Sequence, residues 1–349
     1  MMISKLFLQL PFVLVLSLSL IINKIIAEDW DYGVHHAPVQ NWPGICQSGR
    51  KQSPINIDTA KTQRVEEPID PFVFKGYNKR MFGEMSVLKN NGHTIKFGFS
   101  TNEYASITTP SLEGGGLTDE KYNFLQAHLH WGATNDKGSE HTFDDRHTPM
   151  ELHLVHWNSG LGKDPGESIG TGAFDALAVL SVHFQIGNNN KGLGPFFSNV
   201  DRVIKQGTKA VLSNGVKLGQ FLPQNKDNFY RYNGSLTTPM CEEIVTWTIF
   251  KEKIEISQKQ MDVLRQITYK HYDMDKDEDL SNNFRPTQDL NGRVVQEFGE
   301  TESLAKEDAP SVVVAGWGAE YQLNTASSLN CYMFQLFFFC VIVHKSLLQ

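Results

Sequence analysis

The segment FLQAHLHWG, residues 124–132, places two histidines on either side of a single leucine within an apolar run. In a β-strand, residues i and i+2 face the same side of the sheet, so His128 and His130 project together. Two interpretations of this pair are open. The rings are either two core histidines, each bonded to a neighbouring carbonyl, or two ligands of one metal ion, which needs a third ligand from elsewhere.

A second strand-like run, ELHLVHWN at residues 151–158, supplies a candidate for that third ligand. Its alternation places Glu151, His153 and Val155 on one face of the strand. If the two strands pair side by side, His153 joins the two histidines of the first run. Three neutral imidazoles with an open fourth position are typical of a catalytic zinc site, so we predict Zn²⁺ as the cofactor.

Two residues share a strand face with these histidines and could support them. Gln126 precedes His128 by two positions, and Glu151 precedes His153 by two. An oxygen at either position can accept the ring N–H that the metal does not use, which fixes the tautomer of the ligand. The alternative for Glu151 is a surface charge on a strand edge.

Two loop-like segments, GSEHTFD at 138–144 and NGSLTTPM at 233–240, contribute a carboxylate and two adjacent hydroxyls. A hydroxyl that donates its proton to a buried carboxylate must accept from its other partner. Thr237 could therefore orient a zinc-bound hydroxide if Glu140 takes the threonine proton.

The middle of the chain, from about residue 28 to residue 300, is predicted to be β-rich. Short alternating or continuously apolar runs are separated there by Gly, Pro, Asn and Ser. The clearest helix pattern covers residues 257–267, with Ser257 as the N-cap. The net charge of −7 shows no long run of one sign, and nothing suggests nucleic-acid binding.

Both ends of the chain differ from the middle. Residues 1–27 have the charge and apolar pattern of a secretory signal peptide, with a membrane-anchoring helix as the alternative. Residues 301–328 are interpreted as a stalk and anchor-attachment region, and residues 329–349 as a hydrophobic tail. The apolar run in this tail has only 13 residues, which is short for a spanning helix. We therefore favour a glycosylphosphatidylinositol (GPI) anchor signal over a short transmembrane helix.

The chain has four cysteines, and the last two lie in the tail. If the tail is removed, Cys46 and Cys241 are the remaining pair, and secretion favours a disulfide between them over two free thiols.

These motifs resemble those of the α-class carbonic anhydrases, specifically the extracellular, membrane-anchored members. The resemblance covers most of residues 29–296. Its segments include LKNNGHTIKFGF, QAHLHWG, GSEHTFD, MELHLVHWN, YNGSLTTPMCEEIVTW and NNFRPTQDLNGR, in this order.

The resemblance implies one catalytic domain, residues 28–300, that is mostly β with minor helices around a central, twisted, largely antiparallel sheet. It implies reversible hydration of carbon dioxide to bicarbonate and a proton at the extracellular surface of the plasma membrane. In this reaction a zinc-bound hydroxide attacks carbon dioxide and His93 shuttles the proton. The alternatives are a catalytically idle adhesion or scaffold module of the same fold and a zinc esterase.

The resemblance also implies a role for each matching residue. It assigns the metal to His128, His130 and His153, and orientation of the hydroxide to Glu140 and Thr237. It assigns contacts with the substrate to Thr237, Thr238, Val155, Val179, Leu236 and Trp247, and support of the ligands to Gln126 and Glu151. It also assigns the ordering of water to Tyr32 and Asn91, and a disulfide to Cys46 and Cys241.

Three residues, Thr94, Lys96 and Met240, depart from the family pattern. Met240 stands where most relatives have a second proline, so we expect the loop after Thr238 to be less rigid. A glycosylation sequon, Asn233-Gly234-Ser235, adjoins the same loop, which argues against its efficient modification.

Overall fold

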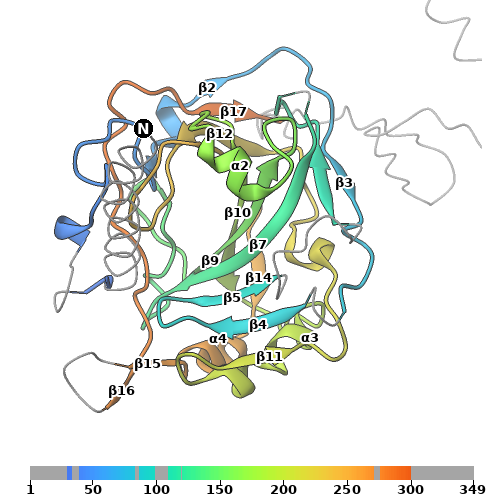
Figure 1. Ribbon diagram of the computed structural model, residues 1–349, viewed down its shortest axis with the longest axis vertical. Helices are drawn as coiled ribbons and strands as arrows, with labels where there is room; N and C mark the ends of the chain where they lie inside the picture. The colour runs from blue at the N-terminus through green and yellow to red at the C-terminus, as the bar shows by residue number, and fades with distance from the viewer. Residues whose placement is uncertain are drawn as a thin grey trace, which may run out of the picture. The chain divides into compact units, whose positions relative to one another are not determined.

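A mixed sheet of 13 strands forms the centre of the protein (Figure 1). The computed structural model describes residues 30–33, 39–82, 86–98, 109–118, 120–270 and 276–299. The predicted signal peptide, stalk and C-terminal tail lie outside the described residues. Most neighbouring strands pair antiparallel, whereas β10 pairs with β13 and β14, and β17 pairs with β2, in parallel. The prediction of a mostly β fold around a largely antiparallel central sheet is confirmed.

Along its main path the sheet runs in the order β11-β4-β5-β7-β9-β10-β13-β12-β17-β2, and β1 with β8 and β15 with β16 form two small separate sheets. The strands are β1 Asn56–Ile57, β2 Gln63–Arg64, β3 Val73–Lys75, β4 Val87–Asn90, β5 Ile95–Gly98, β6 Ser111–Glu113, β7 Tyr122–Trp131, β8 Thr142–Phe143, β9 Met150–Asn158, β10 Leu177–Ile186, β11 Lys209–Val211, β12 Phe229–Gly234, β13 Val245–Phe250, β14 Ile254–Ile256, β15 Thr268–Lys270, β16 Asp277–Asp279 and β17 Gln296–Phe298.

The helices in the described residues are short. The α-helices are α2 Pro165–Gly170, α3 Gly194–Phe197 and α4 Gln258–Leu264, and the 3₁₀ turns are Val39–Asn41, Thr59–Lys61, Val200–Val203 and Leu218–Phe221. The predicted helix is present as α4, and Ser257 caps it through a reciprocal pair of hydrogen bonds with Gln260. It ends at Leu264 instead of reaching Ile267, because the chain turns there toward β15. Among the described residues, no helix has the length and apolar character that a bilayer crossing requires.

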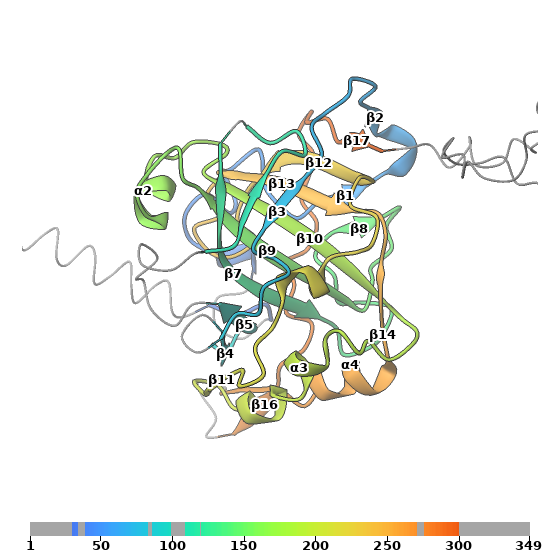
Figure 2. The same ribbon diagram turned by 90° about the vertical axis from the view of Figure 1, so that its right-hand side faces the viewer.

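Strands β7, β9 and β10 cross the middle of the molecule side by side (Figures 1 and 2). Every residue of β9 is buried, so both faces of this strand are covered. Leu152 and Leu154 pack into the larger apolar core on one face, whereas Val155 belongs to a second core together with Val179 and Trp247. Because side chains alternate along β9, one face of this strand only packs against the core, and the other face carries His153.

His156, on the structural face of β9, is completely buried, and its ring contacts the Ala178 carbonyl and the Tyr77 hydroxyl. Burial lowers the pKa of His156 to about 4. Between pH 6.5 and 4 the unfolded chain therefore binds a proton at this ring that the folded chain does not, so stability falls as the pH falls.

We expect the variant His156→Phe to lose less stability on acidification than the wild type. For a pKa of about 4 in the folded state, the contribution of His156 to this loss at pH 5 is about 2 kcal/mol. Urea unfolding at pH 7.5 and pH 5 measures it. An equal loss of unfolding free energy in both proteins would show that His156 is not the group responsible.

Candidate metal centre

The pairing of β7 with β9 brings three histidines together. His128 lies opposite His153 in this antiparallel register, and His130 lies one pair further along, on the same face of β7. The Nδ1 atom of His153 lies 3.2 Å from Nε2 of His128 and 3.2 Å from Nε2 of His130. The ligand nitrogens of all three rings lie within 4.8 Å of one another.

The spacing and chemistry of these nitrogens fit zinc. Tetrahedral zinc binds imidazole nitrogen at about 2.0–2.1 Å, which places neighbouring nitrogens about 3.3 Å apart. The two 3.2 Å separations match that edge length.

Each ring also has a partner for the nitrogen that points away from the cluster. The Nδ1 atom of His128 lies 3.1 Å from Gln126 Oε1, and Nε2 of His153 lies 2.7 Å from Glu151 Oε1. The Nδ1 atom of His130 lies 2.7 Å from the backbone carbonyl of Asn283. These oxygens can only accept, so each fixes the N–H on the outer nitrogen and leaves the inner nitrogen with a free lone pair.

Burial also favours the neutral rings that a metal requires. Burial is the main cause that lowers the pKa of all three rings. It lowers the pKa of His128 well below its usual value, the pKa of His130 to about 3, and the pKa of His153 below its usual value. The three rings are therefore neutral at physiological pH, and their lone pairs are available to a cation.

A second group, His141, Glu151 and His153, also lies close together. Here the carboxylate Oε1 is 2.7 Å from a nitrogen of each ring. This is the length of a charge-assisted hydrogen bond, so protons occupy these contacts and the group supports His153 instead of forming another metal site.

Glu140 and Thr237 are both buried, and the Glu140 carboxylate lies close to His130 and His153. Glu140 Oε1 accepts a hydrogen bond from the Arg285 backbone N–H at 2.9 Å. Its Oε2 has no hydrogen-bond partner among the described residues and lies 3.4 Å from His130 Nε2. Burial raises the pKa of Glu140 well above its usual value, whereas the Arg285 N–H and the adjacent Thr237 hydroxyl lower it. A cation at the histidine nitrogens would favour the carboxylate form.

The four apolar residues predicted to contact substrate form one group. Val155 pairs with Val179 across β9 and β10, and Val179 pairs with Trp247 across β10 and β13. All three are buried, and Leu236 packs against the same core. The Trp247 ring lies 4.8 Å from the ring of His153, so this wall adjoins the candidate metal centre.

His93, the predicted proton shuttle, stacks on Trp30. The ring centroids are 3.9 Å apart and the planes differ by 4°. Burial lowers the pKa of His93 to about 4, with a smaller opposing effect from Asp31. The stack with Trp30 has no signal in the sequence pattern, because Trp30 is distant in the chain and lies outside the regular strands.

Tyr32 and Asn91, the predicted water-ordering residues, occupy different environments. Tyr32 is packed among aromatic rings, with its ring centroid 6.4 Å from that of His130. The side-chain oxygen of Asn91 accepts hydrogen bonds from the backbone N–H groups of His93 and Thr94 at 3.0 and 2.8 Å. This Asx-type turn holds the backbone of His93 in place.

The disulfide between Cys46 and Cys241 is present, as the cysteine count predicts. It adjoins the threonine loop, where the Cys241 N–H donates to the Thr238 carbonyl at 3.0 Å. Met240 has a φ of 76°. Because proline is confined to a φ near −65°, this backbone could not accommodate a proline at this position.

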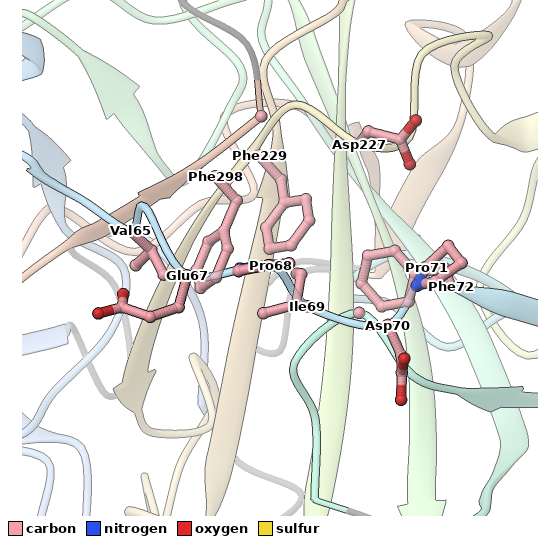
Figure 3. A pocket seen from close by; sticks show the side chains of 12 residues that line it. Val65, Glu67, Pro68, Ile69, Asp70, Pro71, Phe72, Asp227, Phe229 and Phe298 are labelled. Carbon is pink, nitrogen blue, oxygen red and sulfur yellow. The ribbon is translucent and has the colours of Figure 1, made fainter.

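A separate pocket lies between the loop before β3 and strands β12 and β17 (Figure 3). Its lining includes three phenylalanines, Phe72, Phe229 and Phe298, and three carboxylates, and none of the predicted site residues belongs to it. The carboxylates of Glu67 and Asp70 point to different sides of the pocket (Figure 3). The pocket therefore lacks a convergent set of ligands, and the histidine centre is the better candidate site.

Comparison with known proteins points to one family. The model of the eukaryotic-type carbonic anhydrases matches residues 35–298. Putative carbonic anhydrase 3 of Caenorhabditis elegans is 40% identical over 258 residues, which cover 73% of this chain and 91% of that protein. Carbonic anhydrase 4 of Rattus norvegicus is 34% identical over 283 residues, 80% of this chain and 85% of the rat protein. Carbonic anhydrase 12 of Homo sapiens is 35% identical over 249 residues, 71% of this chain and 66% of the human protein.

Proposed function

Because the chain belongs to the eukaryotic-type carbonic anhydrase family, we propose that it is a zinc-dependent enzyme that interconverts carbon dioxide and bicarbonate. The observation that carries this proposal is the geometry of His128, His130 and His153. Two of the separations between their inner nitrogens match the edge of a tetrahedral zinc site, and their outer nitrogens are all hydrogen-bonded to acceptors.

The three histidines would hold the metal through Nε2 of His128, Nε2 of His130 and Nδ1 of His153. Zinc bound in such a site lowers the pKa of a coordinated water from 15.7 to about 7 and so supplies a nucleophile at neutral pH. Gln126, Glu151 and the Asn283 carbonyl keep the rings in the required tautomers.

Glu140 and Thr237 would orient the attacking oxygen. If the Thr237 hydroxyl donates its single proton to the buried Glu140 carboxylate, its oxygen can only accept from a group in the cleft. The hydroxyl would then accept a hydrogen bond from the nucleophile and so select one orientation of it. Thr238 is the next residue of the same loop and would contact the substrate from that side.

Carbon dioxide carries no net charge, and the adjacent wall suits it. Val155, Val179, Leu236 and Trp247 offer apolar surface and exclude competing water. The size of Val155 and Val179 would favour a small substrate over a bulky ester. No observation favours the esterase or the idle module over the hydratase.

His93 would carry the proton to solvent, because an imidazole with an ordinary pKa titrates near neutrality. In the stack with Trp30, however, the ring holds a proton poorly, since its pKa is about 4. We propose that His93 must leave this stack to act as a shuttle, which makes Trp30 a determinant of the proton-transfer step.

We expect the variant Trp30→Ala to raise the pKa of His93 from about 4 toward the unperturbed value of about 6.5, because the ring regains water. The NMR titration of the His93 ring in the zinc-loaded protein measures this change. A pKa still below 5 in the variant would contradict the assignment of Trp30 as the cause.

For the location, we propose a signal peptide at 1–27, a catalytic domain at 28–300, a stalk at 301–328 and a GPI signal at 329–349, which together place the enzyme at the outer cell surface. The Cys46–Cys241 disulfide supports this proposal, because disulfides persist in oxidising compartments. Phosphatidylinositol-specific phospholipase C treatment of expressing cells tests the anchor. Release into the medium supports the lipid anchor, and retention would favour a spanning helix.

The direct test of the proposed reaction is stopped-flow measurement of carbon dioxide hydration by the full-length chain purified from animal cells. We expect fast turnover that depends on zinc and on buffer. A rate equal to that of buffer alone, in protein shown to hold zinc, would favour the idle adhesion or scaffold module.

A further inference from the structure

The carboxylate of Glu151 accepts more hydrogen bonds than the support of one histidine requires. Its Oε1 accepts from His153 Nε2, His141 Nδ1 and Ser181 Oγ, each at 2.7 Å. Its Oε2 accepts from the backbone N–H groups of Glu140 and His141, each at 2.8 Å. Glu151 is fully buried, so the protein groups around it determine how the carboxylate is oriented.

Two of the groups around this carboxylate come from β10, the strand on the far side of β9 from His128. In the antiparallel register, Ser181 lies opposite His153, and His183 lies opposite Glu151. Ser181 and His183 are two residues apart, so both side chains project from the same face of β10 as the carboxylate does from β9. Neither residue was identified from the sequence.

One nitrogen of His183 has no hydrogen-bond partner among the residues that the structure describes. The ring is fully buried, its Nδ1 lies 2.9 Å from Thr148 Oγ1, and its Nε2 lies 3.7 Å from Glu151 Oε2. No hydrogen-bond partner for Nε2 is found in the part of the chain that is described.

The tautomer of His183 follows from the charge it faces. A lone pair on Nε2 would point toward a carboxylate oxygen and be repelled by it, whereas an N–H there is attracted. The Thr148 hydroxyl has a single proton, which it can give to Nδ1 at 2.9 Å or to the Met150 carbonyl at 3.1 Å. The charge of Glu151 favours donation to Nδ1, because Nε2 then carries the N–H that is directed at the carboxylate. The ring of Phe143, 4.7 Å away, packs against His183 and limits its rotation.

We propose that Ser181 and His183 are positioning residues of the metal centre, which hold the Glu151 carboxylate so that it keeps His153 in the tautomer and orientation that bind zinc. This inference rests on the proposed function, since it assumes that the three histidines bind zinc. Neither residue touches the metal or the substrate. They orient the Glu151 carboxylate, which in turn orients the ligand His153, and in this way they determine the zinc affinity.

The test is zinc binding by the full-length variants Ser181→Ala, which removes only a hydroxyl, and His183→Phe, which keeps a flat ring but removes both nitrogens. Two matched controls lose similar buried groups away from Glu151. Ser168→Ala removes a hydroxyl that donates to the Ala176 carbonyl, and His156→Phe removes a buried ring on the opposite face of β9.

The readouts are the rate of zinc release to an excess of chelator, the zinc dissociation constant, and the visible spectrum of the Co²⁺-substituted protein. Groups that orient a metal ligand typically affect metal affinity by about 10–100-fold. We expect about tenfold weaker zinc binding, faster release and an altered Co²⁺ spectrum in each β10 variant. The controls should match the wild type, whatever their effect on thermal stability.

Zinc dissociation constants within twofold of the wild type in both β10 variants would overturn the inference, even if both variants are less stable. Equal weakening in the controls would also overturn it, because the effect would then be a general loss of stability. If the wild type itself bound no zinc, the proposed function would fail first, so the two failures are distinguishable.

Discussion

The variant His153→Ala is expected to bind zinc on the order of 10³-fold more weakly than the wild type and to hydrate carbon dioxide at the rate of buffer. Protein zinc sites bind with about 10–16 kcal/mol in total, so one ligand contributes roughly 3–5 kcal/mol. A 10³-fold loss is about 4 kcal/mol, within this range. Nδ1 of His153 faces both other ligand nitrogens, and the Glu151 carboxylate loses one of its donors in the variant. Equilibrium competition with a chelator measures the affinity, and stopped-flow measures the hydration.

His156→Phe is the matched control for this experiment. It alters a buried histidine three residues further along β9, whose side chain lies in the opposite core with Tyr77. We expect it to keep zinc affinity and hydration close to wild type while it loses stability. Full zinc affinity in His153→Ala would refute the assignment of this residue as a ligand.

Replacing both disulfide cysteines, Cys46→Ala with Cys241→Ala, is expected to lower the free energy of unfolding by roughly 5 kcal/mol. The bond joins residues 195 positions apart, and closing a loop of this size restricts the unfolded chain by about that amount in the chain-entropy model. Urea unfolding of the two proteins in their zinc-loaded forms measures the difference.

The same double variant should also loosen the threonine loop. Cys241 donates its N–H to the Thr238 carbonyl, and the Cys46 carbonyl accepts from the side chain of Arg285. Since the Arg285 backbone N–H holds Glu140, the disulfide contributes to both sides of the predicted Glu140–Thr237 pair. An unfolding free energy within about 1 kcal/mol of the wild type would show that contacts other than the disulfide stabilise this region.

The sequence predicts the part of the site that depends on strand periodicity. The i, i+2 spacing of His128 and His130 puts both rings on one face, and the alternation around His153 does the same on its partner strand. The three rings converge only if the two strands pair side by side, and the pairing of β7 with β9 meets that condition. The Cys46–Cys241 bond could be predicted for a simpler reason, since the chain offers no other pair outside its tail.

The groups that support the ligands could not be predicted in the same way. The partner of His130 is a backbone carbonyl at Asn283, and every residue has such a carbonyl, so the sequence carries no signal for it. Ser181 and His183 contact Glu151 only because β10 pairs with β9 in one particular register. The position of His93 depends on packing with Trp30, a long-range contact that no local pattern encodes.

The central claim is that zinc at the three histidines is required for carbon dioxide hydration, and the most direct test is a zinc titration of the metal-stripped, full-length protein with the hydration rate followed throughout. We predict no activity above buffer without zinc, a linear rise as zinc is added, and a plateau at one zinc per chain. Full activity in the stripped protein, or none with one zinc bound per chain, would contradict the account.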